Sequence, residues 1–223
     1  LTLAKTKITG KGLSRVPRLP SLEWLSLEGT RITDADLAHL SRFPKLYELD
    51  LTDTQVGALT TTQLGVLNTT ALNTLSTTQV AAFATTQVQS LSSTQLNALS
   101  ATNLSAIDAT AMSSLNATQL RGITATQLAG LSTTDISEFA DTQIGSLTST
   151  QIGALGATNF SALDGTQIAA LNATQMGGIT VTELRGLSTT DIAEFADTQV
   201  AALNATQIGS LNATNFSSLS TTA

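Results

Sequence analysis

The chain has 223 residues, of which 12% are charged and 41% are hydrophobic, and it contains no cysteine. This apolar content argues against a disordered chain, and the missing cysteines exclude a disulfide framework or a thiolate zinc site. Residues 54–223 carry two arginines against nine acidic side chains, so they offer no electrostatic footprint for nucleic acid or anionic lipid. No apolar run approaches the roughly 18 residues that a membrane helix requires.

Residues 1–59 contain one pattern three times. The pattern is Leu-x-Leu-x-x-Thr, and its threonines, Thr6, Thr30 and Thr54, are evenly spaced. It resembles the leucine-rich-repeat family, whose units span roughly 20–29 residues. The resemblance implies that each unit runs from a strand through a turn to a helical return, here over residues 34–40. Threonine replaces the family's usual asparagine, so we expect hydroxyls to make the side-chain bonds to the backbone.

Two aromatic residues of this segment, Trp24 and Tyr47, lie outside the alternating strand leucines. An exposed aromatic side chain there suits a protein contact, and a cover over the open end of the core is an equal alternative. His39 is the one histidine, on the predicted return helix beside Asp36. With no nucleophile motif around it, we interpret His39 as a surface residue.

From Thr54 onward the repeat shortens to an octad, and threonine occupies every eighth position up to Thr222. Two apolar positions alternate at spacings of three and five, beginning with Val56 and Leu59. On a continuous helix each octad advances about 800°, so the apolar stripe would spiral around the helix. A continuous strand would place half of these apolar side chains outward. The spacing therefore predicts a short helix and a turn in every octad.

The polar positions support this prediction. In Ser76-Thr-Thr-Gln79 the serine and the glutamine have the spacing of a capping box, in which each side chain bonds to the other residue's backbone. Ser76 would be the N-cap, and Val80 and Phe83 would be buried. A helix of about six residues does not persist alone in water, so the helices must stack into a solenoid.

The predicted fold is thus a repeat solenoid. A leucine-rich-repeat segment of α/β type over residues 1–59 continues into a mainly α solenoid over residues 60–223, with one very short helix per octad. A β-solenoid is the alternative. Since the chain begins at Leu1, with neither Met nor a signal peptide, we expect a mature form or an excised fragment.

The repeated threonine is β-branched and a poor helix former, so it must serve a positional role. We interpret it as a structural ladder, in which each hydroxyl bonds to a carbonyl of the neighbouring repeat. An exposed row that binds ice or sugar is the alternative. The predicted ladder residues are Thr54, Thr62, Thr78, Thr86, Thr94, Thr118, Thr126, Thr142, Thr150, Thr174, Thr198 and Thr206.

A longer period of seven octads is also present. It relates Thr133-Thr-Asp to Thr189-Thr-Asp, and Gly122 to Gly178. This recurrence indicates that the array grew by copying blocks of seven octads. A coil of two, three or four octads would not map onto itself under that step. Either a coil does not contain a whole number of octads, or no feature of the copied block needs to lie on a particular face of the solenoid.

Two sets of polar residues are candidates for chemistry. Asp135, Glu138 and Asp141 form an acidic cluster that recurs seven octads later. Carboxylates can bind calcium, but acids also stabilise the first turn of a helix, and we prefer that interpretation. Several Asn-x-Ser/Thr sequons occur, although a capping asparagine followed by the repeated threonine produces the same pattern. They include Asn68, Asn116, Asn172, Asn204 and Asn212.

These features predict a non-enzymatic repeat scaffold that mediates protein interaction or cell-surface adhesion, without cofactor or metal. The octads loosely resemble Thr/Gln/Leu-rich repeats of large bacterial surface proteins, which implies adhesion or spacing. The alternatives are a threonine-lined solenoid that binds ice or carbohydrate, and a mechanical spacer in a longer chain. We expect a protein partner, with neither nucleic-acid binding nor membrane insertion. A bacterial surface or secretion is favoured over the cytoplasm.

Overall fold

The computed structural model describes residues 1–27, 29–32, 36, 39–40, 42–43, 45–46, 56–57, 59–65 and 67–219, and the backbone of residues 48–50. The chain forms two compact units, Leu1–Ser114 and Leu115–Ala223. No helix in the described part of the chain is both long and apolar enough to cross a bilayer.

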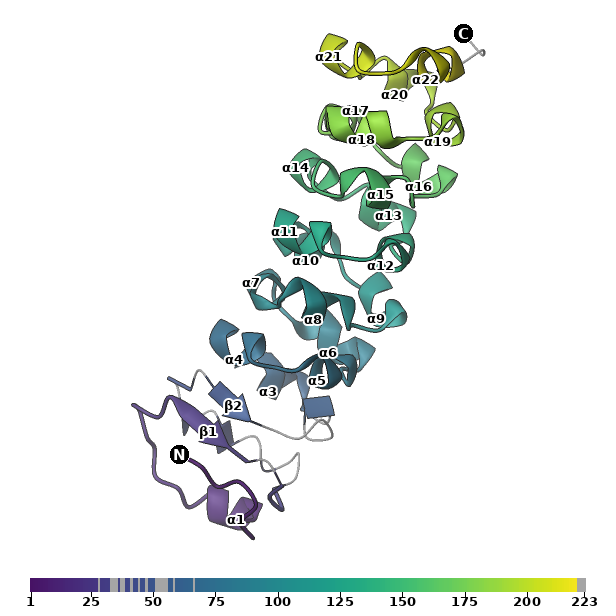
Figure 1. Cartoon of the computed structure of the whole chain (residues 1–223). Coiled ribbons are helices and arrows are strands. Elements are labelled where there is room, and N and C mark those ends of the chain that lie inside the picture. Colours follow the sequence, from purple (N-terminus) through teal and green to yellow (C-terminus); the bar gives the residue numbers. More distant parts are fainter. Residues whose placement is uncertain are drawn as a thin grey trace. The chain divides into compact units, whose positions relative to one another are not determined.

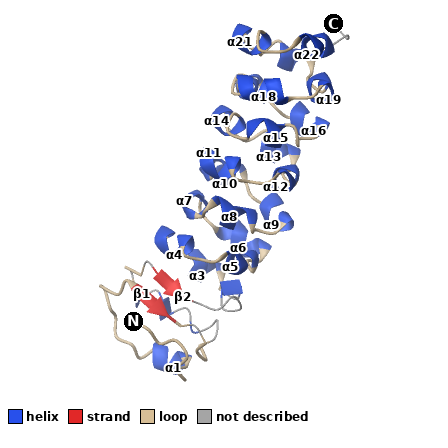
Figure 2. Cartoon of the chain, in the orientation of Figure 1, coloured by secondary structure: helices blue, strands red, loops and turns tan. Residues whose placement is uncertain are grey.

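The elements of the first unit are one short sheet and a series of very short helices (Figures 1 and 2). In order they are α1 (Gly10–Leu13), β1 (Trp24–Ser26), β2 (Glu48–Asp50), α3 (Thr61–Gly65), α4 (Thr69–Asn73), α5 (Thr77–Ala81), α6 (Thr85–Ser90), α7 (Ser93–Ala98), α8 (Ala101–Ser105) and α9 (Ala109–Ser113).

The described residues of the second unit form helices throughout. In order they are α10 (Ala117–Gly122), α11 (Ala125–Ala129), α12 (Thr133–Ser137), α13 (Asp141–Ile144), α14 (Ser149–Ile152), α15 (Gly156–Phe160), α16 (Gly165–Ala169), α17 (Ala173–Met176), α18 (Val181–Gly186), α19 (Thr189–Ala193), α20 (Asp197–Val200), α21 (Ala205–Ile208) and α22 (Ala213–Ser218).

The first unit begins with a coil that repeats at the spacing of Thr6 and Thr30. β1 pairs in parallel with β2, and Trp24 lies opposite Glu48. An isolated parallel bridge joins Thr2 to Ser26, and these two residues have the same separation along the chain as Trp24 and Glu48. Leu25 and Leu27 are fully buried, so the period of the sequence is the period of a parallel coil. The predicted return helix over residues 34–40 lies mostly outside the described residues.

The threonine hydroxyls of this coil bond locally. The Oγ1 atoms of Thr6 and Thr30 donate to the carbonyls of Leu3 and Leu27, each at 2.6 Å. Both bonds lie within a single turn of the chain. The expected side-chain bonds to the backbone therefore form, but each holds its own turn rather than joining one coil to the next. Thr54, the third member of the pattern, lies outside the described residues.

Most helices of the octads begin as the capping-box pattern predicts. At α5 the Ser76 Oγ accepts from the backbone N–H of Gln79 at 3.2 Å, and Gln79 Oε1 accepts from the N–H of Ser76 at 2.8 Å. The two predicted apolar positions, Val80 and Phe83, are buried. One very short helix per octad is thus confirmed for α3 to α22, and the β-solenoid alternative is not the observed fold.

Three octads make one coil in each unit. In the first unit α3 packs against α6, α4 against α7, α5 against α8, and α6 against α9. In the second unit the same step joins α12 to α15, α15 to α18 and α18 to α21, and likewise joins helices on the other two faces. Figure 1 shows α17 to α19 as one such layer and α20 to α22 as the next.

The coil of three helical octads therefore contains as many residues as the coil of strands that precedes it. Within the first unit α4 lies against β2, and the Asn68 Nδ2 atom donates to the Leu46 carbonyl. The apolar pair of most octads is buried inside the coil, whereas Phe216 near the end of the described chain is exposed. The remaining side chains of each helix, apart from the buried third residue, form three outer faces.

Candidate functional site

The contacts between successive coils depend on the third residue of each helix, most often a glutamine. Its Oε1 closes the capping box, and its Nε2 crosses to the preceding coil. Gln151 Nε2 donates to the carbonyls of Ile123 and Leu120, at 2.7 and 2.8 Å. The acceptors lie 28 and 31 residues earlier. One or both bonds recur, within one unit each, at Gln87, Gln95, Asn103, Gln143, Asn159, Gln167, Gln175, Gln199, Gln207 and Asn215.

This set of bonds, here called the glutamine ladder, satisfies two groups that a chain of short helices leaves unpaired. Every helix start has free N–H groups, and every helix end has free carbonyls. A carboxamide carries an acceptor and a donor at its two ends. One buried glutamine therefore caps its own helix and bonds to the end of the helix beneath it.

The repeated threonine, one residue before the glutamine, faces solvent. The predicted threonine ladder is corrected: at its described positions the side chains are exposed, and no hydroxyl of these residues bonds to a carbonyl of a neighbouring coil. Among the other repeated threonines, Thr166 Oγ1 donates to Asp141 Oδ1 of the preceding coil at 3.3 Å. The second helical position points away from the coil, whereas the third points into it. Thr54 lies outside the described residues. The exposed members are Thr62, Thr78, Thr86, Thr94, Thr118, Thr126, Thr142, Thr150, Thr174, Thr198 and Thr206.

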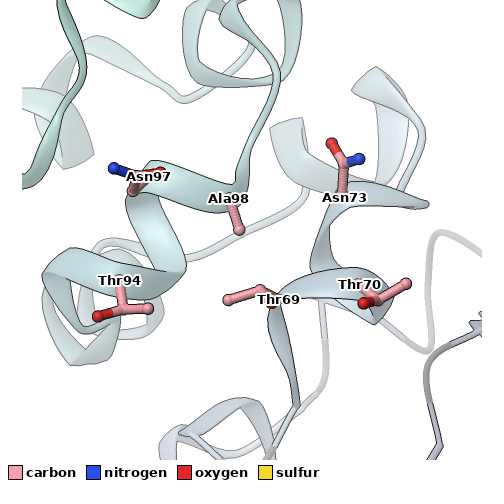
Figure 3. Close-up of a pocket in the computed structure, with 6 residues that line it drawn as sticks. All are labelled: Thr69, Thr70, Asn73, Thr94, Asn97 and Ala98. Carbon is pink, nitrogen blue, oxygen red and sulfur yellow. The ribbon is translucent and has the colours of Figure 1, made fainter.

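Shallow grooves lie between stacked helices where these threonines emerge. The α4–α7 groove in the first unit has a volume of about 370 Å³ and is lined by hydroxyls, amides and one alanine. In Figure 3 Thr69 and Ala98 face the gap between the two helices, and Asn97 and Asn73 lie on opposite sides of this gap. The lining residues are Thr69, Thr70, Asn73, Thr94, Asn97 and Ala98.

The two asparagines of this groove stand on successive coils. Asn73 and Asn97 are three octads apart and are the only asparagines at this octad position. Both side chains are exposed, and neither side-chain amide has a hydrogen-bond partner among the described residues. Their amide groups are thus available to a ligand.

A groove of similar character lies in the second unit. It runs from α12 across α15 to α18 and has a volume of about 550 Å³. No titratable side chain lines either groove in the described part of the chain. The lining residues are Thr133, Ala157, Thr158, Ser161, Ala162 and Gly186.

The octads around the α4–α7 groove resemble a known repeat. Residues 56–93 match the family model of the ALTTAQ repeat. Within this match, residues 58–63 read Ala-Leu-Thr-Thr-Thr-Gln. There Thr60 and Gln63 form a capping box, with the Thr60 N–H 2.7 Å from Gln63 Oε1 and the Gln63 N–H 3.2 Å from Thr60 Oγ1.

The ALTTAQ match recognises a repeat family in the octads, and no leucine-rich repeat is recognised in residues 1–59. No curated protein matches the chain. Thr69, Thr70 and Asn73 of the α4–α7 groove fall within the ALTTAQ match, and Thr94 follows it directly.

The acidic residues are engaged in caps and in bonds between coils. Asp135 Oδ2 accepts from the backbone N–H and the hydroxyl of Ser132, each at 2.8 Å. Asp191 Oδ2 accepts from the Ser188 N–H at 2.8 Å and from the Ser161 hydroxyl of the preceding coil at 2.6 Å. Among the described residues no group of three or more His, Asp or Glu side chains could hold a metal ion.

The surroundings of Glu194 disfavour the ionised form of its carboxylate. Partial burial raises its pKa above the ordinary value, and the neighbouring Asp191 and Asp164 raise it further. Asp164 shows the opposite shift, because hydrogen bonds from Thr166 and Gln167 lower its pKa.

The remaining candidates from the sequence are structural or incompletely described. Trp24 is half-buried in β1, His39 is half-buried, and Tyr47 lies outside the described residues. The five sequon asparagines named from the sequence are N-caps whose side chains accept backbone N–H groups, as the capping pattern predicts. They are Asn68, Asn116, Asn172, Asn204 and Asn212.

Proposed function

We propose that the chain is a non-enzymatic repeat scaffold that mediates adhesion by binding a partner protein through the uncharged, hydroxyl- and amide-lined grooves of its outer faces. The observation that carries this proposal is the exposure of the repeated threonine. The fold uses the glutamine to join its coils, so the threonine is left free for recognition. The free amides of Asn73 and Asn97 add donors and acceptors at one place on this surface.

The absence of charge from the grooves supports binding rather than catalysis. Their lining residues are threonine, serine, asparagine, alanine and glycine. General acid–base chemistry requires a titratable side chain within hydrogen-bond reach of the reacting proton. Repeated weak contacts by many such grooves would give avidity without any single tight site.

The test uses a film of mucin, a glycosylated protein, and the same film after enzymatic removal of its glycans. Deleting residues 77–84 removes α5, so α7 would follow α4 by two octads and no longer stack on it. The α4–α7 groove is then split while all six lining residues remain. Deleting residues 205–212 removes one octad elsewhere and is the matched control.

We expect the wild-type chain and the control to bind the film, and the split-groove variant to bind several-fold more weakly. Retention on the deglycosylated film would indicate a polypeptide partner. Equal binding by all three chains, or no binding by any of them, would contradict a scaffold that adheres through this surface. No binding is the result expected of a mechanical spacer.

A second candidate is a threonine-lined solenoid that binds carbohydrate or ice, and the exposed threonines favour it. This candidate requires exposed hydroxyls in rows, and stacked coils give each face such rows within a unit. Loss of binding on the deglycosylated film would support the carbohydrate form. Inhibition of ice recrystallisation by the wild-type chain would support the ice form.

We propose further that residues 1–59 are a leucine-rich-repeat segment. Support comes from the parallel pairing of Trp24 with Glu48 and from the buried Leu25 and Leu27. Thr30 takes the place of the family's asparagine: its Oγ1 donates to the Leu27 carbonyl and accepts from the Ile32 N–H. An asparagine amide can form both bonds, so Thr30→Asn should leave the melting temperature unchanged or raise it.

A further inference from the structure

Glu183 is the one carboxylate that is buried among the described residues, with an exposed fraction of 0%. It is the third residue of α18, where most octads place the ladder glutamine. The offsets of the glutamine ladder would direct it toward the carbonyls of Leu155 and Ile152. An ionised carboxylate has no donor to offer them. The ladder must therefore change at this point.

The peptide between Leu155 and Gly156 is turned over relative to the other octads. The residue before a cap has an extended conformation elsewhere, as at Leu187 with ψ 144, but Leu155 has ψ −34. A cap such as Asp164 has φ −83, but Gly156 has φ 74. These two angles flank one peptide, so both changes together rotate it. Glycine is required because other residues rarely adopt a positive φ.

The turned peptide presents its N–H to the carboxylate. Gly156 N–H donates to Glu183 Oε1 at 2.9 Å. The other oxygen, Oε2, accepts from the Thr180 N–H at 2.6 Å and from the Thr180 hydroxyl at 2.9 Å. The carboxylate thus has three donors, and the bond between coils runs in the opposite direction from that of a glutamine.

The sequence shows the two members of this pair changing together. Seven octads earlier, Glu183 corresponds to Gln127 and Gly156 to Ser100. The glutamine at the ladder position occurs with a capping serine one coil earlier, and the glutamate occurs with a glycine there. This pairing is expected if each glutamate-for-glutamine change needs a peptide that can turn over.

The surroundings of Glu183 contain little charge. α15 and α21, which pack against α18, carry no titratable side chain. Arg185 on α18 is exposed, and Asp191 on α19 is bonded to Ser188 and Ser161. Desolvation raises the pKa of Glu183 above its ordinary 4.5, although hydrogen bonds from Thr180 and Gly156 oppose this shift.

We propose that Glu183 and Gly156 form a proton-sensitive switch between α15 and α18. While the carboxylate is ionised, it holds the 155–156 peptide turned over by accepting the Gly156 N–H. When Glu183 takes a proton from solvent, it gains an O–H donor and resembles a glutamine. The peptide then returns to the orientation of the other octads, and the Leu155 carbonyl accepts from the Glu183 O–H.

The test follows the Gly156 amide by NMR while the pH is lowered from 7.5 to 4. Labelling glycine alone with nitrogen-15 leaves 15 labelled residues to assign in the intact chain. We expect the Gly156 signal to move in one transition with a midpoint above 4.5. Glu183→Gln should abolish the transition. A Gly156 signal that does not move, or that still moves in Glu183→Gln, would overturn the proposal.

A mutant cycle tests the pairing by a second measurement. Gly156→Ser forces a side chain into a positive φ, whereas Glu183→Gln supplies a donor and lets the 155–156 peptide return to the orientation of the other octads. We expect Gly156→Ser alone to lower the melting temperature at pH 7, and Glu183→Gln alone to leave it unchanged or raise it. The double variant, which recreates the Ser100 and Gln127 pairing, should recover the wild-type value and lack the Gly156 transition. Additive effects of the two changes would contradict the coupling.

Discussion

The side chain that matters most at the residue scale is the ladder glutamine, because it serves two coils at once. Two octads lack it and have a buried alanine instead, Ala71 and Ala111. A coil therefore tolerates a missing ladder bond when a small apolar residue fills the place. A polar side chain that cannot bond would be less well tolerated, since an unpaired buried group retains its full desolvation cost.

Replacing Gln151 should destabilise the second unit. Gln151→Ala removes the donor to the Ile123 and Leu120 carbonyls, and the Leu120 carbonyl still accepts from the Ile123 N–H. The loss should be about 2–3 kcal/mol, because one buried carbonyl loses its partner and the capping box is broken. Urea unfolding followed by circular dichroism measures it.

The neighbouring threonine is the matched control for Gln151. Thr150→Ala changes an exposed side chain and introduces a better helix former. The free energy of unfolding should therefore stay within about 0.5 kcal/mol of the wild-type value. Equal destabilisation by the two variants would indicate that the threonine also stabilises the fold.

The acidic side chains predict a pH effect at Glu194. Because its pKa is raised in the folded chain, the folded state binds this proton more tightly than the unfolded state does. The contribution of Glu194 to stability therefore falls as pH rises from about 4.5 through the raised pKa. Glu194→Gln should raise the melting temperature slightly at pH 7 and flatten its fall between pH 4.5 and 7. An unchanged pH profile would show that burial, Asp191 and Asp164 do not raise the pKa of this carboxylate.

At the element scale, the short helix was the part of the fold that the sequence specified locally. A capping residue, a glutamine three positions on and an apolar pair at a spacing of three define the start and the buried face of α5 without any distant contact. The turn after each helix follows from the same pattern, because the next cap ends the helix. These features repeat in most octads, so an interpretation of one octad applies along the array.

A capping side chain should be the simplest way to stabilise such a helix. Ala140 precedes α13 and has no side-chain acceptor, although its N–H donates to Gln143 Oε1 at 2.9 Å. Ala140→Ser would complete the box and should stabilise the chain by about 0.5–1 kcal/mol. Ser132→Ala at α12 is the reverse change and should cost a similar amount. Thermal melts of both variants decide this, and a neutral Ala140→Ser would indicate that the glutamine alone suffices.

The number of octads in a coil and the direction of the glutamine amide were not predictable from one sequence. The capping box uses Oε1 of Gln79, and nothing in the local pattern indicates where its Nε2 points. The acceptors of a ladder glutamine lie 28 and 31 residues away, so they are found only when the coil length is known. Threonine is constant in the octads whereas the neighbouring glutamine is sometimes replaced, so the sequence alone favours the threonine as the structural position. The burial of the glutamine distinguishes the two positions in the structure.

At the scale of the whole chain, the coil of three octads explains the effect of the longer, seven-octad period. Seven octads are two coils and one further octad, so a copied block moves its features to the next face. The two copies of the acidic pattern behave in this way, since α12 stacks on α15 whereas α19 stacks on α22. No feature of the copied block therefore needs to lie on a particular face of the solenoid. A feature needed on one face would be lost by such copying, but the threonines survive it because they occur on all faces.

The same logic predicts which insertions the array accepts. A copy of residues 141–148 inserted after Thr148 adds one octad, and each ladder bond that crosses it finds an equivalent carbonyl one octad further on. A copy of residues 141–144 inserted at the same place shifts the register by half an octad. The bonds of Gln151, Asn159, Gln167 and Gln175 would then meet no helix end.

We expect the whole-octad insertion to change the melting temperature by only a few degrees. The half-octad insertion loses the bonds of four ladder side chains, at about 1 kcal/mol each, and should lower the melting temperature by about 10 °C or more. Circular dichroism at 222 nm during heating compares the two chains. If both melted at the same temperature, the register of the ladder would not be what holds successive coils together, and the apolar pairs alone would set the stacking.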